Sequence, residues 1–242
     1  MTSNMIKAIA CLCMLIDHIG YLFFPEAIFL RCIGRIAFPI FAYFIGEGCY
    51  YTSRPVRYFL RIFGLAVLCQ LFYSGQQLLD GGITEMYLNI LFTFSLSIPV
   101  CLTFLRLRES YKDYYPSVVF EKTIIFVATL FIVGIIWIFC TIAEKKIGLK
   151  IVMDYAPFGI LLPLFAVLRR TPKRKRILFS IGVALFALIG YRETPYALFS
   201  LLSVPILLLH NGKRGSKKLQ YVFYAFYPLH FAVLYGISLL VK

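Results

Sequence analysis

The sequence predicts an all-α protein, a polytopic bundle of transmembrane helices, and three features of its 242 residues indicate this class. Hydrophobic residues make up 61% of the chain and charged residues only 15%, whereas soluble domains are about half apolar and about a quarter charged. The mean hydropathy is +0.83. Apolar stretches long enough to cross a bilayer recur along the chain. These features exclude a single water-soluble domain, a disordered chain and a nucleic-acid-binding domain that folds in water.

The apolar stretches are interpreted as about nine membrane spans, since a transmembrane helix needs about 20 apolar residues for a hydrocarbon core about 30 Å thick. The expected spans cover residues 5–24, 28–52, 57–74, 87–106, 123–143, 151–168, 176–191, 195–210 and 219–241. There is no long linker, low-complexity tract or convincing internal repeat. Residues 1–242 are therefore expected to form a single integral-membrane domain.

The first apolar segment is interpreted as a membrane helix rather than a cleaved signal peptide. It has no small-residue cleavage site, and it carries Asp17 and His18. The seven cysteines nearly all fall in apolar stretches, where a free cysteine behaves as a small hydrophobic residue. Their odd number argues against a disulfide framework, and no Cys-x-x-Cys or Cys/His cluster implies a metal site.

The net charge of +14, from 25 Lys and Arg against 11 Asp and Glu, is explained by basic cytoplasmic loops. Basic residues gather after the second, fourth, sixth and eighth expected spans, at residues 54–61, 106–122, 169–176 and 213–218. The intervening loops carry Asp80 with Glu85, then Glu144, then Glu193. The positive-inside rule therefore predicts a multi-pass protein of the inner or plasma membrane, with a cytoplasmic N-terminus and an outer C-terminus.

Ionisable side chains inside the expected spans are the first candidates for function, because charges at hydrocarbon depth are costly and face the bundle interior or a cavity. At 1.5 Å per residue, His18 lies about 9 Å below the outer surface and Arg35 about 10 Å below it. Asn89 and Asp154 lie near the outer starts of their spans. Several spans therefore place polar groups at one level in the outer half of the bundle.

Proton transfer is the chemistry that this set of residues supports. Histidine titrates near neutral pH and can act as a general base, which makes His18 the candidate. An arginine can stabilise a developing oxyanion or hold a carbonyl or phosphate group, which is the role expected of Arg35. For Asp17 the pattern leaves open a relay with His18, a structural pair with His18, or an ion pair with Arg35.

Other polar positions also have two interpretations each. Tyr227 and His230 share one face of the last expected span, where His230 forms either part of the site or a packing hydrogen bond. Glu47 lies near the cytoplasmic end, where Arg57 or Arg61 would neutralise it, although a role in cofactor binding is also open. The basic loops are topology signals, and they would also suit the phosphates of an anionic cytosolic donor.

Several short motifs occur in a specific order along nearly the whole chain. They are Ile16-Asp17-His18-Ile19-Gly20, residues 33–41 (IGRIAFPIF), Gly46-Glu47-Gly48, residues 57–61 (RYFLR), residues 211–215 (NGKRG) and residues 223–230 (FYAFYPLH). In this order they resemble the TraX family. The family's named member is an inner-membrane protein that acetylates the N-terminal amine of conjugative pilin. The family is similar to membrane acyltransferases that use cytosolic acetyl-CoA to modify acceptors at the outer face.

The resemblance implies a membrane acetyltransferase that uses acetyl-CoA as its acyl donor. His18 would be the catalytic base, with Asp17 and Arg35 in the same site. The basic loops suggest Arg54, Arg57, Arg61, Lys213 and Arg214 for binding the donor's phosphates. The resemblance adds Glu47, Tyr227 and His230 to the wall of the site, and the outer polar level adds Asn89 and Asp154. The expected partners are acetyl-CoA or CoA, the lipid bilayer, and an extracytoplasmic amine or hydroxyl acceptor such as a peptide or pilin N-terminus or a glycan; no nucleic acid is expected.

A transporter or flippase is the alternative class of protein. The same buried Asp17, His18, Arg35 and Asp154 would then form a relay for protons or substrate. Transporters usually contain internal structural repeats, and the absence of a convincing repeat in this sequence counts against that class.

Overall fold

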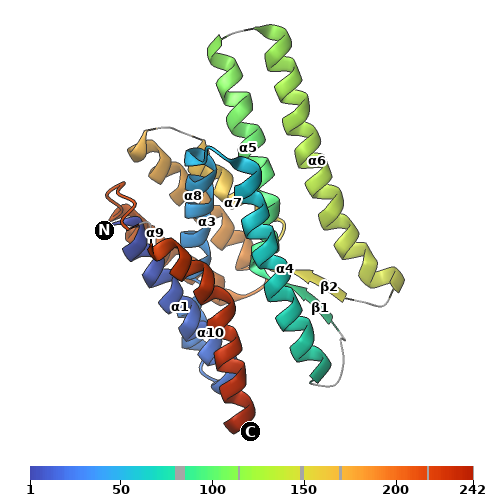
Figure 1. Ribbon diagram of the computed structural model, residues 1–242, viewed down its shortest axis with the longest axis vertical. Helices are drawn as coiled ribbons and strands as arrows, with labels where there is room; N and C mark the ends of the chain where they lie inside the picture. Colours follow the sequence, from blue (N-terminus) through green and yellow to red (C-terminus); the bar gives the residue numbers. More distant parts are fainter. Residues whose placement is uncertain (80–84, 114, 148–149, 169–170, 217, 242) are drawn as a thin grey trace. The chain divides into compact units, whose positions relative to one another are not determined.

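The computed structural model describes residues 1–79, 85–113, 115–147, 150–168, 171–216 and 218–241 (Figure 1). Apart from two strands of four residues each, the elements in these ranges are helical, so the predicted all-α class is confirmed. Asp80, Arg169 and Arg170, which the sequence places in loops, lie outside the described residues. The elements are α1 (Ser3–Phe23), α2 (Ile28–Gly34), α3 (Ala37–Tyr51), α4 (Pro55–Leu79), β1 (Glu85–Leu88), α5 (Ile90–Asp113), α6 (Pro116–Ile147), β2 (Lys150–Met153), α7 (Phe158–Val167), α8 (Pro172–Gly190), the 3-10 helix η1 (Pro195–Leu202), α9 (Ser203–Leu208) and α10 (Leu219–Val241).

Within the described residues, six helical segments are long and apolar enough to cross a membrane. They are Ser3–Phe23, Ile28–Tyr51, Pro55–Leu78, Ile90–Lys112, Pro116–Cys140 and Tyr221–Val241. The other three of the nine expected spans are shorter or more charged. The helix α7 has ten residues, η1 and α9 together form one short apolar stretch, and α8 carries four consecutive basic residues after Pro172 at its start. The chain is a multi-pass membrane protein.

The second expected span, residues 28–52, consists of two helices rather than one. The first helix, α2, ends at Gly34, and α3 begins at Ala37. Pro39 has no N–H group, so it cannot donate to the carbonyl of Arg35 four residues earlier. In the first turn of α3 no such donor is needed, and Pro39 is tolerated there. The break between the helices falls at Arg35 and Ile36.

Two expected spans begin as strands, which corrects their predicted boundaries. The segments expected at 87–106 and 151–168 start instead with β1 and β2, which pair in parallel from Glu85 with Lys150 to Leu88 with Met153. The side-chain amide of Gln70 continues this ladder on β1, since it donates to the carbonyl of Tyr87 at 3.0 Å and accepts from Asn89 N–H at 3.3 Å. The pairing of β1 with β2 supplies hydrogen-bond partners for backbone N–H and C=O groups of these residues. In a helix the same groups would have bonded to one another.

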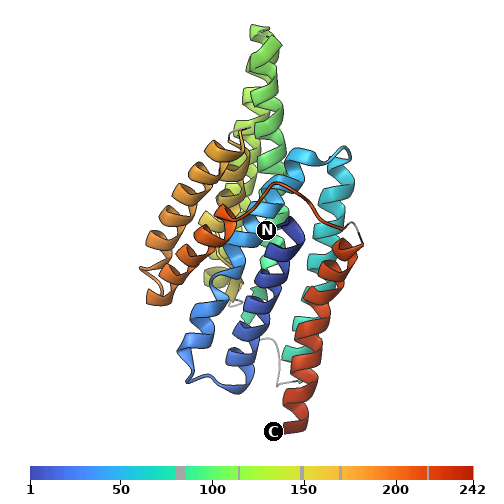
Figure 2. The same cartoon turned by 90° about the vertical axis from the view of Figure 1, so that its left-hand side faces the viewer.

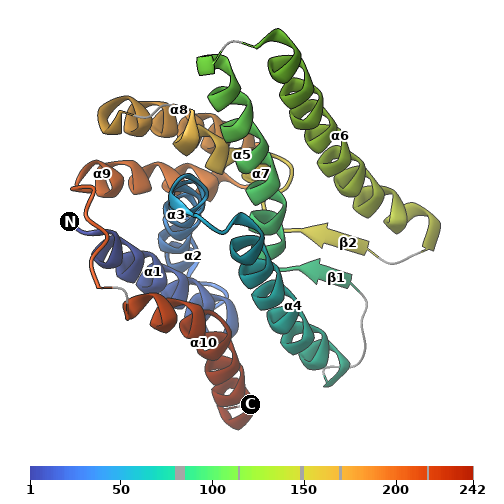
Figure 3. The same cartoon turned by 45° about the horizontal axis from the view of Figure 1, so that its top comes forward.

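The chain forms two compact units, one comprising residues 1–44 and 169–242 and the other residues 45–168. In the first unit, α1 contacts α2 and α10, and η1 contacts α2, α8 and α9. Figures 1 and 2 show α10 running beside α1, and Figure 3 shows α8 beside the segment formed by η1 and α9. Large side chains that are fully buried in this unit include Ile6, Phe38, Ile40, Phe179 and Val183.

The centre of the second unit is α5, which contacts α4, α6 and α7. The buried hydroxyl groups of this helix are satisfied internally, because Ser95 and Ser97 donate to the carbonyls of Leu91 and Thr93 one turn earlier, at 2.7 and 2.9 Å. Small residues allow α3 and α7 to approach each other closely in this unit. A Cβ atom on Gly46 would lie 2.6 Å from the Pro163 carbonyl oxygen and 2.7 Å from the Ala166 methyl group.

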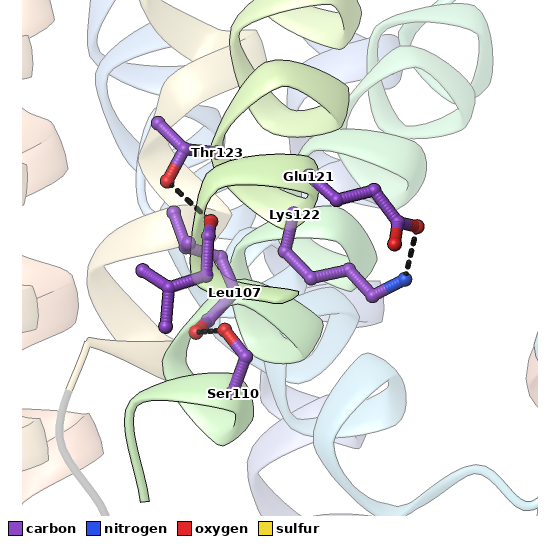
Figure 4. A network of polar contacts seen from close by, with 6 residues as sticks. Leu107, Ser110, Glu121, Lys122 and Thr123 are labelled. Carbon is purple, nitrogen blue, oxygen red and sulfur yellow. Dashed lines mark hydrogen bonds and ion pairs between the residues drawn. The ribbon is translucent and has the colours of Figure 1, made fainter. Parts of the chain in front are cut away.

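Polar residues near the connection from α5 to α6 make local contacts within their own helices (Figure 4). The hydroxyl of Ser110 donates to the carbonyl of Leu107 at 2.7 Å, and the hydroxyl of Thr123 donates to the carbonyl of Val119 at 2.8 Å. Glu121 and Lys122 form an exposed ion pair at 2.7 Å. Such exposed pairs contribute little stability, so apolar packing along α5 is the main support for the second unit.

Candidate functional site

A hydrogen-bonded pair of histidines, His18 on α1 and His230 on α10, lies within the first unit. The Nδ1 atom of His18 is 2.7 Å from the Nε2 atom of His230. The two ring planes are nearly parallel, with centroids 4.9 Å apart and an interplanar angle of 15°, as expected of imidazoles bonded edge to edge. His230 is only 6% exposed. The structure therefore brings together two histidines that are 212 positions apart in the sequence, and we call them the His18–His230 pair.

Aromatic side chains of α10 hold the His18–His230 pair in place. Phe226 stacks on the ring of His230 at 4.8 Å, while Tyr227 contacts it edge-on at 5.8 Å. Phe231 contacts the ring of His18 edge-on at 5.4 Å. The carbonyl oxygen of Phe226 lies 2.8 Å from Nδ1 of His230. Tyr227 and His230 share one helix face, as the sequence predicts.

The ion-pair partner of Asp17 is Arg31, which the sequence analysis did not select. Arg31 Nη1 lies 3.0 Å from Asp17 Oδ2, and it also donates to the Asp17 carbonyl at 3.4 Å. Arg35, one of the partners considered for Asp17, places its guanidinium group 4.9 Å from the ring centroid of Tyr196 on η1. Arg35 lies one helical turn after Arg31, since its backbone N–H bonds the Arg31 carbonyl at 3.3 Å, and its guanidinium group extends to Tyr196.

Gly34 allows α2 to pass directly against Asp17. A Cβ atom at this position would overlap the Oδ1, Cγ and Cβ atoms of the Asp17 side chain. Oδ1 itself is buried and has no hydrogen-bond partner among the described residues. Asp17 is thus held on one side by Arg31 and confined on the other by the backbone of α2, next to the histidine that follows it in sequence.

The basic residues Lys213 and Arg214 lie on an exposed loop, residues 211–216, that is anchored to the start of α1. Ser3 donates its backbone N–H to the Lys213 carbonyl at 2.9 Å, and Asn4 donates its side-chain amide to the Ser216 carbonyl at 2.8 Å. Gly212 and Gly215 flank the two basic residues with φ angles of 76° and 83°. Because its carbonyl groups bind α1, the loop has a defined conformation and its two basic side chains are exposed.

The third histidine of the chain, His210, lies at the base of this loop. Its Nε2 atom is 3.0 Å from the hydroxyl of Ser3, and its ring contacts Tyr43 and Phe44 edge-on. Arg176 donates to the His210 carbonyl at 2.7 Å. The contact between Ser3 and His210 is buried and joins positions 207 apart. It anchors the loop to α1 at the end of the helix opposite the His18–His230 pair.

Three of the residues implied for donor binding and one implied for the wall lie in or next to α3 and α4 of the second unit. Arg54, Arg57 and Arg61 are exposed along the start of α4, and Arg61 Nε donates to the Arg57 carbonyl at 3.3 Å. Glu47 is half-buried in α3. The predicted roles of these four residues stay predictions.

Asn89 and Asp154 lie together with the two strands of the second unit. Asn89 caps α5 by accepting from Leu91 N–H at 3.1 Å, and its amide donates to the Ala66 carbonyl at 2.9 Å. The carboxylate of Asp154 is hydrogen-bonded to the hydroxyl of Tyr87. The side chain of Asn89 thus stabilises the start of α5 and its contact with α4, and its predicted role in the wall of a site stays a prediction.

Sequence reasoning did not identify Arg31, Phe226, Tyr196, Ser3 or His210. Arg31 carried a usable signal, because it is an ionisable residue inside an expected span. His210 carried a weaker one, as one of only three histidines in the chain. The carbonyl of Phe226 and the ring of Tyr196 could not be found from sequence, since their importance comes from which atoms they meet.

The fold and this arrangement define a class of protein: a multi-pass membrane protein with a partly buried histidine pair beside an aspartate–arginine ion pair. Comparison with known proteins then identifies the family. The family model described as "TraX protein" matches residues 2–238. The chain belongs to the TraX family, as the sequence motifs indicate.

Two curated proteins are similar to this chain. A probable fimbrial assembly protein, FimC of serogroup H1 from Dichelobacter nodosus, is 26% identical over 254 residues, which cover 95% of this chain and 92% of that protein. An uncharacterized protein of Rickettsia prowazekii (strain Madrid E) is 45% identical over 47 residues, which cover 19% of each chain. No solved structure matches the chain significantly.

Proposed function

We propose that this protein is an acetyltransferase that moves an acetyl group from cytosolic acetyl-CoA to an amine or hydroxyl acceptor at the outer face of the membrane. The observation that carries the proposal is the His18–His230 pair, because a general base needs an imidazole with a defined orientation and the hydrogen bond to His230 gives His18 one. Membership of the TraX family supports the same class of reaction.

In the proposed reaction, His18 acts as the general base. As the acceptor nitrogen or oxygen attacks the thioester carbonyl carbon, the acceptor proton passes to His18 and a tetrahedral intermediate forms. The intermediate collapses when its carbon–sulfur bond breaks, and the proton on His18 passes to the departing CoA sulfur. The products are the acetylated acceptor and CoA with a free thiol, and His18 returns to its starting state.

Arg35 is proposed to stabilise the oxyanion of the tetrahedral intermediate. The guanidinium group is always charged, and its contact with the ring of Tyr196 restricts its position. The ion pair between Asp17 and Arg31 is proposed to hold the α1 segment that carries His18 against α2. Asp17 is therefore proposed as a positioning residue. It is the residue directly before His18 in the sequence.

The phosphates of the donor are assigned to Lys213 and Arg214, with Arg54, Arg57 and Arg61 as further candidates. Anchoring of the 211–216 loop supports the assignment to Lys213 and Arg214, because an ordered loop loses less entropy on binding a ligand. Glu47, Asn89, Asp154, Tyr227 and His230 remain candidates for the wall of the site.

The proposed topology has about nine spans, a cytoplasmic N-terminus and a single integral domain in the inner membrane. The contacts between residues 1–4 and the 211–216 loop support one part of it, since a basic loop bonded to the N-terminal residues would lie on their side of the membrane. Since α10 then crosses once, the C-terminus would lie on the other side. An odd number of spans meets this condition, whereas six spans would not.

The acceptor is proposed to be a pilin-like protein. The supporting observation is the similarity to a protein described as a probable fimbrial assembly protein, which extends over nearly the full length of both chains. An extracytoplasmic glycan is the other acceptor considered, because the same base would serve an amine or a hydroxyl group.

The first experiment measures acetyl-CoA binding and release of free CoA thiol by the purified protein in detergent, with and without amine and hydroxyl acceptors. We expect His18→Ala to lower the rate by about 10²- to 10⁴-fold, the usual contribution of a general base. The control is Gly134→Ala in α6, where an added Cβ atom meets nothing within 4 Å. Thermal unfolding of each variant shows whether it is folded.

Donor binding is tested separately by Lys213→Gln and Arg214→Gln, each expected to raise the KM for acetyl-CoA about tenfold with little change in kcat. Lys173→Gln, at an exposed basic position of α8, is the control. Full activity of His18→Ala would contradict the proposed base. No binding of acetyl-CoA at millimolar concentration would contradict the donor, and the protein would then be tested as a transporter that uses the histidines as a proton relay.

A further inference from the structure

His230 makes two hydrogen bonds that together determine which nitrogen of His18 is free to accept a proton. One bond joins Nδ1 of His230 to the backbone carbonyl oxygen of Phe226, at 2.8 Å. A carbonyl oxygen can only accept a hydrogen bond, so Nδ1 of His230 must carry the proton. In a neutral imidazole the other nitrogen is then an acceptor. Nε2 of His230 is therefore unprotonated, and its lone pair can accept a hydrogen bond.

The second bond follows from the first. Nε2 of His230 lies 2.7 Å from Nδ1 of His18, and because Nε2 accepts, Nδ1 of His18 must donate. A neutral His18 then has its proton on Nδ1 and its lone pair on Nε2. If His230 were instead charged, both of its nitrogens would donate, and placing a charged imidazolium at a 6% exposed position with no described carboxylate bonded to it is unfavourable.

We propose that His230 is the positioning residue of the site: through the carbonyl of Phe226 it holds His18 in the Nδ1–H form, with Nε2 as the nitrogen that takes the acceptor's proton. The inference deepens the proposed function and rests on it for the reaction, but the protonation pattern stands without it. When Nε2 of His18 gains a proton, Nδ1 goes on donating to His230 and no other hydrogen bond changes direction. The base therefore changes its charge without reorganisation of its support.

This role differs from a packing contact, because it depends on the direction of two hydrogen bonds and not on the volume of the imidazole ring. Two substitutions separate the bonds. The amide of glutamine reaches about as far as Nε2 of histidine, so His230→Gln can still accept from His18. The amide of asparagine reaches about as far as Nδ1, so His230→Asn can still donate to the Phe226 carbonyl but cannot reach His18.

The test has one readout that needs no activity. The protein is labelled with ¹⁵N-histidine and studied by NMR in detergent, where its three histidines give few ring signals. His18→Gln and His210→Gln assign the signals. In the wild type, His18 and His230 are expected to be protonated at Nδ1 and unprotonated at Nε2. A His18 protonated at Nε2 would overturn the inference, whether or not the protein transfers acetyl groups.

The second readout compares the two His230 variants in the transfer assay, after thermal unfolding has shown that both fold. His230→Gln is expected to keep kcat within about tenfold of the wild type, while His230→Asn is expected to lose more, up to about the 10⁴-fold effect of holding a catalytic histidine in the wrong tautomer. Equal activity of the two variants would overturn the positioning role. Absence of activity in the wild type would instead contradict the proposed function, and the NMR result would still decide the protonation pattern.

Discussion

At the scale of single residues, three charged groups of the first unit have specific neighbours. Asp17 pairs with Arg31, and Arg35 lies against the ring of Tyr196. Both arginines are in the segment before α3, only four positions apart. Their backbones lie one helical turn apart, since the Arg35 N–H is bonded to the Arg31 carbonyl, so the direction of each side chain, and not a change of helix face, gives them these contacts.

The pairing of Asp17 can be tested by double-mutant cycles. We expect Asp17→Asn and Arg31→Gln to show a coupling free energy of about 1–3 kcal/mol, because removing one member leaves the other partly buried without its ion-pair partner. The same cycle with Arg35→Gln is expected to give a smaller coupling. Unfolding in detergent supplies the free energies. A larger coupling with Arg35 than with Arg31 would show that Asp17 belongs with Arg35.

The contact between Gly34 and Asp17 leads to a second prediction at this scale. Gly34→Ala places a methyl group in the space of the Asp17 side chain and is expected to cost about 1–3 kcal/mol of stability, as overpacking does. Gly134→Ala in α6 is the matched control, because a Cβ atom there meets nothing within 4 Å. Thermal unfolding measures both. Equal effects of the two substitutions would mean that the close approach of α2 to Asp17 is not tight in solution.

At the scale of elements, hydrogen bonds to loops and strands set the limits of the helices. The 211–216 loop is attached to α1 by Ser3 and Asn4, and the strand β1 is completed by the amide of Gln70 from α4. In both cases a polar side chain satisfies backbone groups of a segment that is distant in sequence. Hydropathy alone places these segments at the ends of helices, because it contains no information about hydrogen bonds to distant side chains.

The attachment of the 211–216 loop can be measured by limited trypsin digestion, since Lys213 and Arg214 are exposed. We expect Asn4→Ala to increase the cleavage rate after these residues about fivefold, because one hydrogen bond to the loop, worth about 1 kcal/mol, is lost. Cleavage after Lys173 is the internal reference.

Gly212 and Gly215 provide a matched pair for the same measurement. Both have positive φ, so alanine is strained at either position, but only at 215 would its Cβ atom meet Asn4, at 2.8 Å from Nδ2. Gly215→Ala is therefore expected to increase cleavage more than Gly212→Ala. The same increase in both variants would indicate that backbone strain alone opens the loop and that Asn4 does not anchor it.

At the scale of the whole molecule, the question is how many times the chain crosses the membrane. Length and composition support six spans in the described residues, while the alternation of basic loops predicts about nine. Six spans would leave both termini on the same side of the membrane, whereas nine would leave them on opposite sides. Labelling and fusion experiments distinguish the two. The seven native cysteines are free and buried, so newly introduced cysteines can be labelled with little background.

We expect a membrane-impermeant maleimide to label Glu26→Cys in intact cells and Ser53→Cys only after the cells are opened, because the two residues flank the second expected span. A C-terminal fusion to green fluorescent protein should be dark and one to alkaline phosphatase active, since nine spans place that end outside. Labelling of Ser53→Cys from outside would reverse the orientation. A fluorescent C-terminal fusion would show an even number of spans.

The sequence by itself determined the class of this protein and most of its candidate residues. An apolar fraction of 61% can be accommodated only in a membrane, and helices are the way for such a chain to satisfy its backbone there. The order of the motifs was enough to indicate the TraX family. These conclusions depend on composition and on local order, which are properties of the chain before it folds.

Only the tertiary structure decided which residues meet. In the folded chain His18 is hydrogen-bonded to His230, 212 positions away, and Asp17 forms an ion pair with Arg31. The starts of two expected spans are paired strands and not helices. The physical reason is that hydropathy reports how much a segment prefers the membrane, not how it is rotated or where it breaks. Hydrogen bonds and ion pairs depend on direction within a few ångströms, and that is settled only when the helices pack.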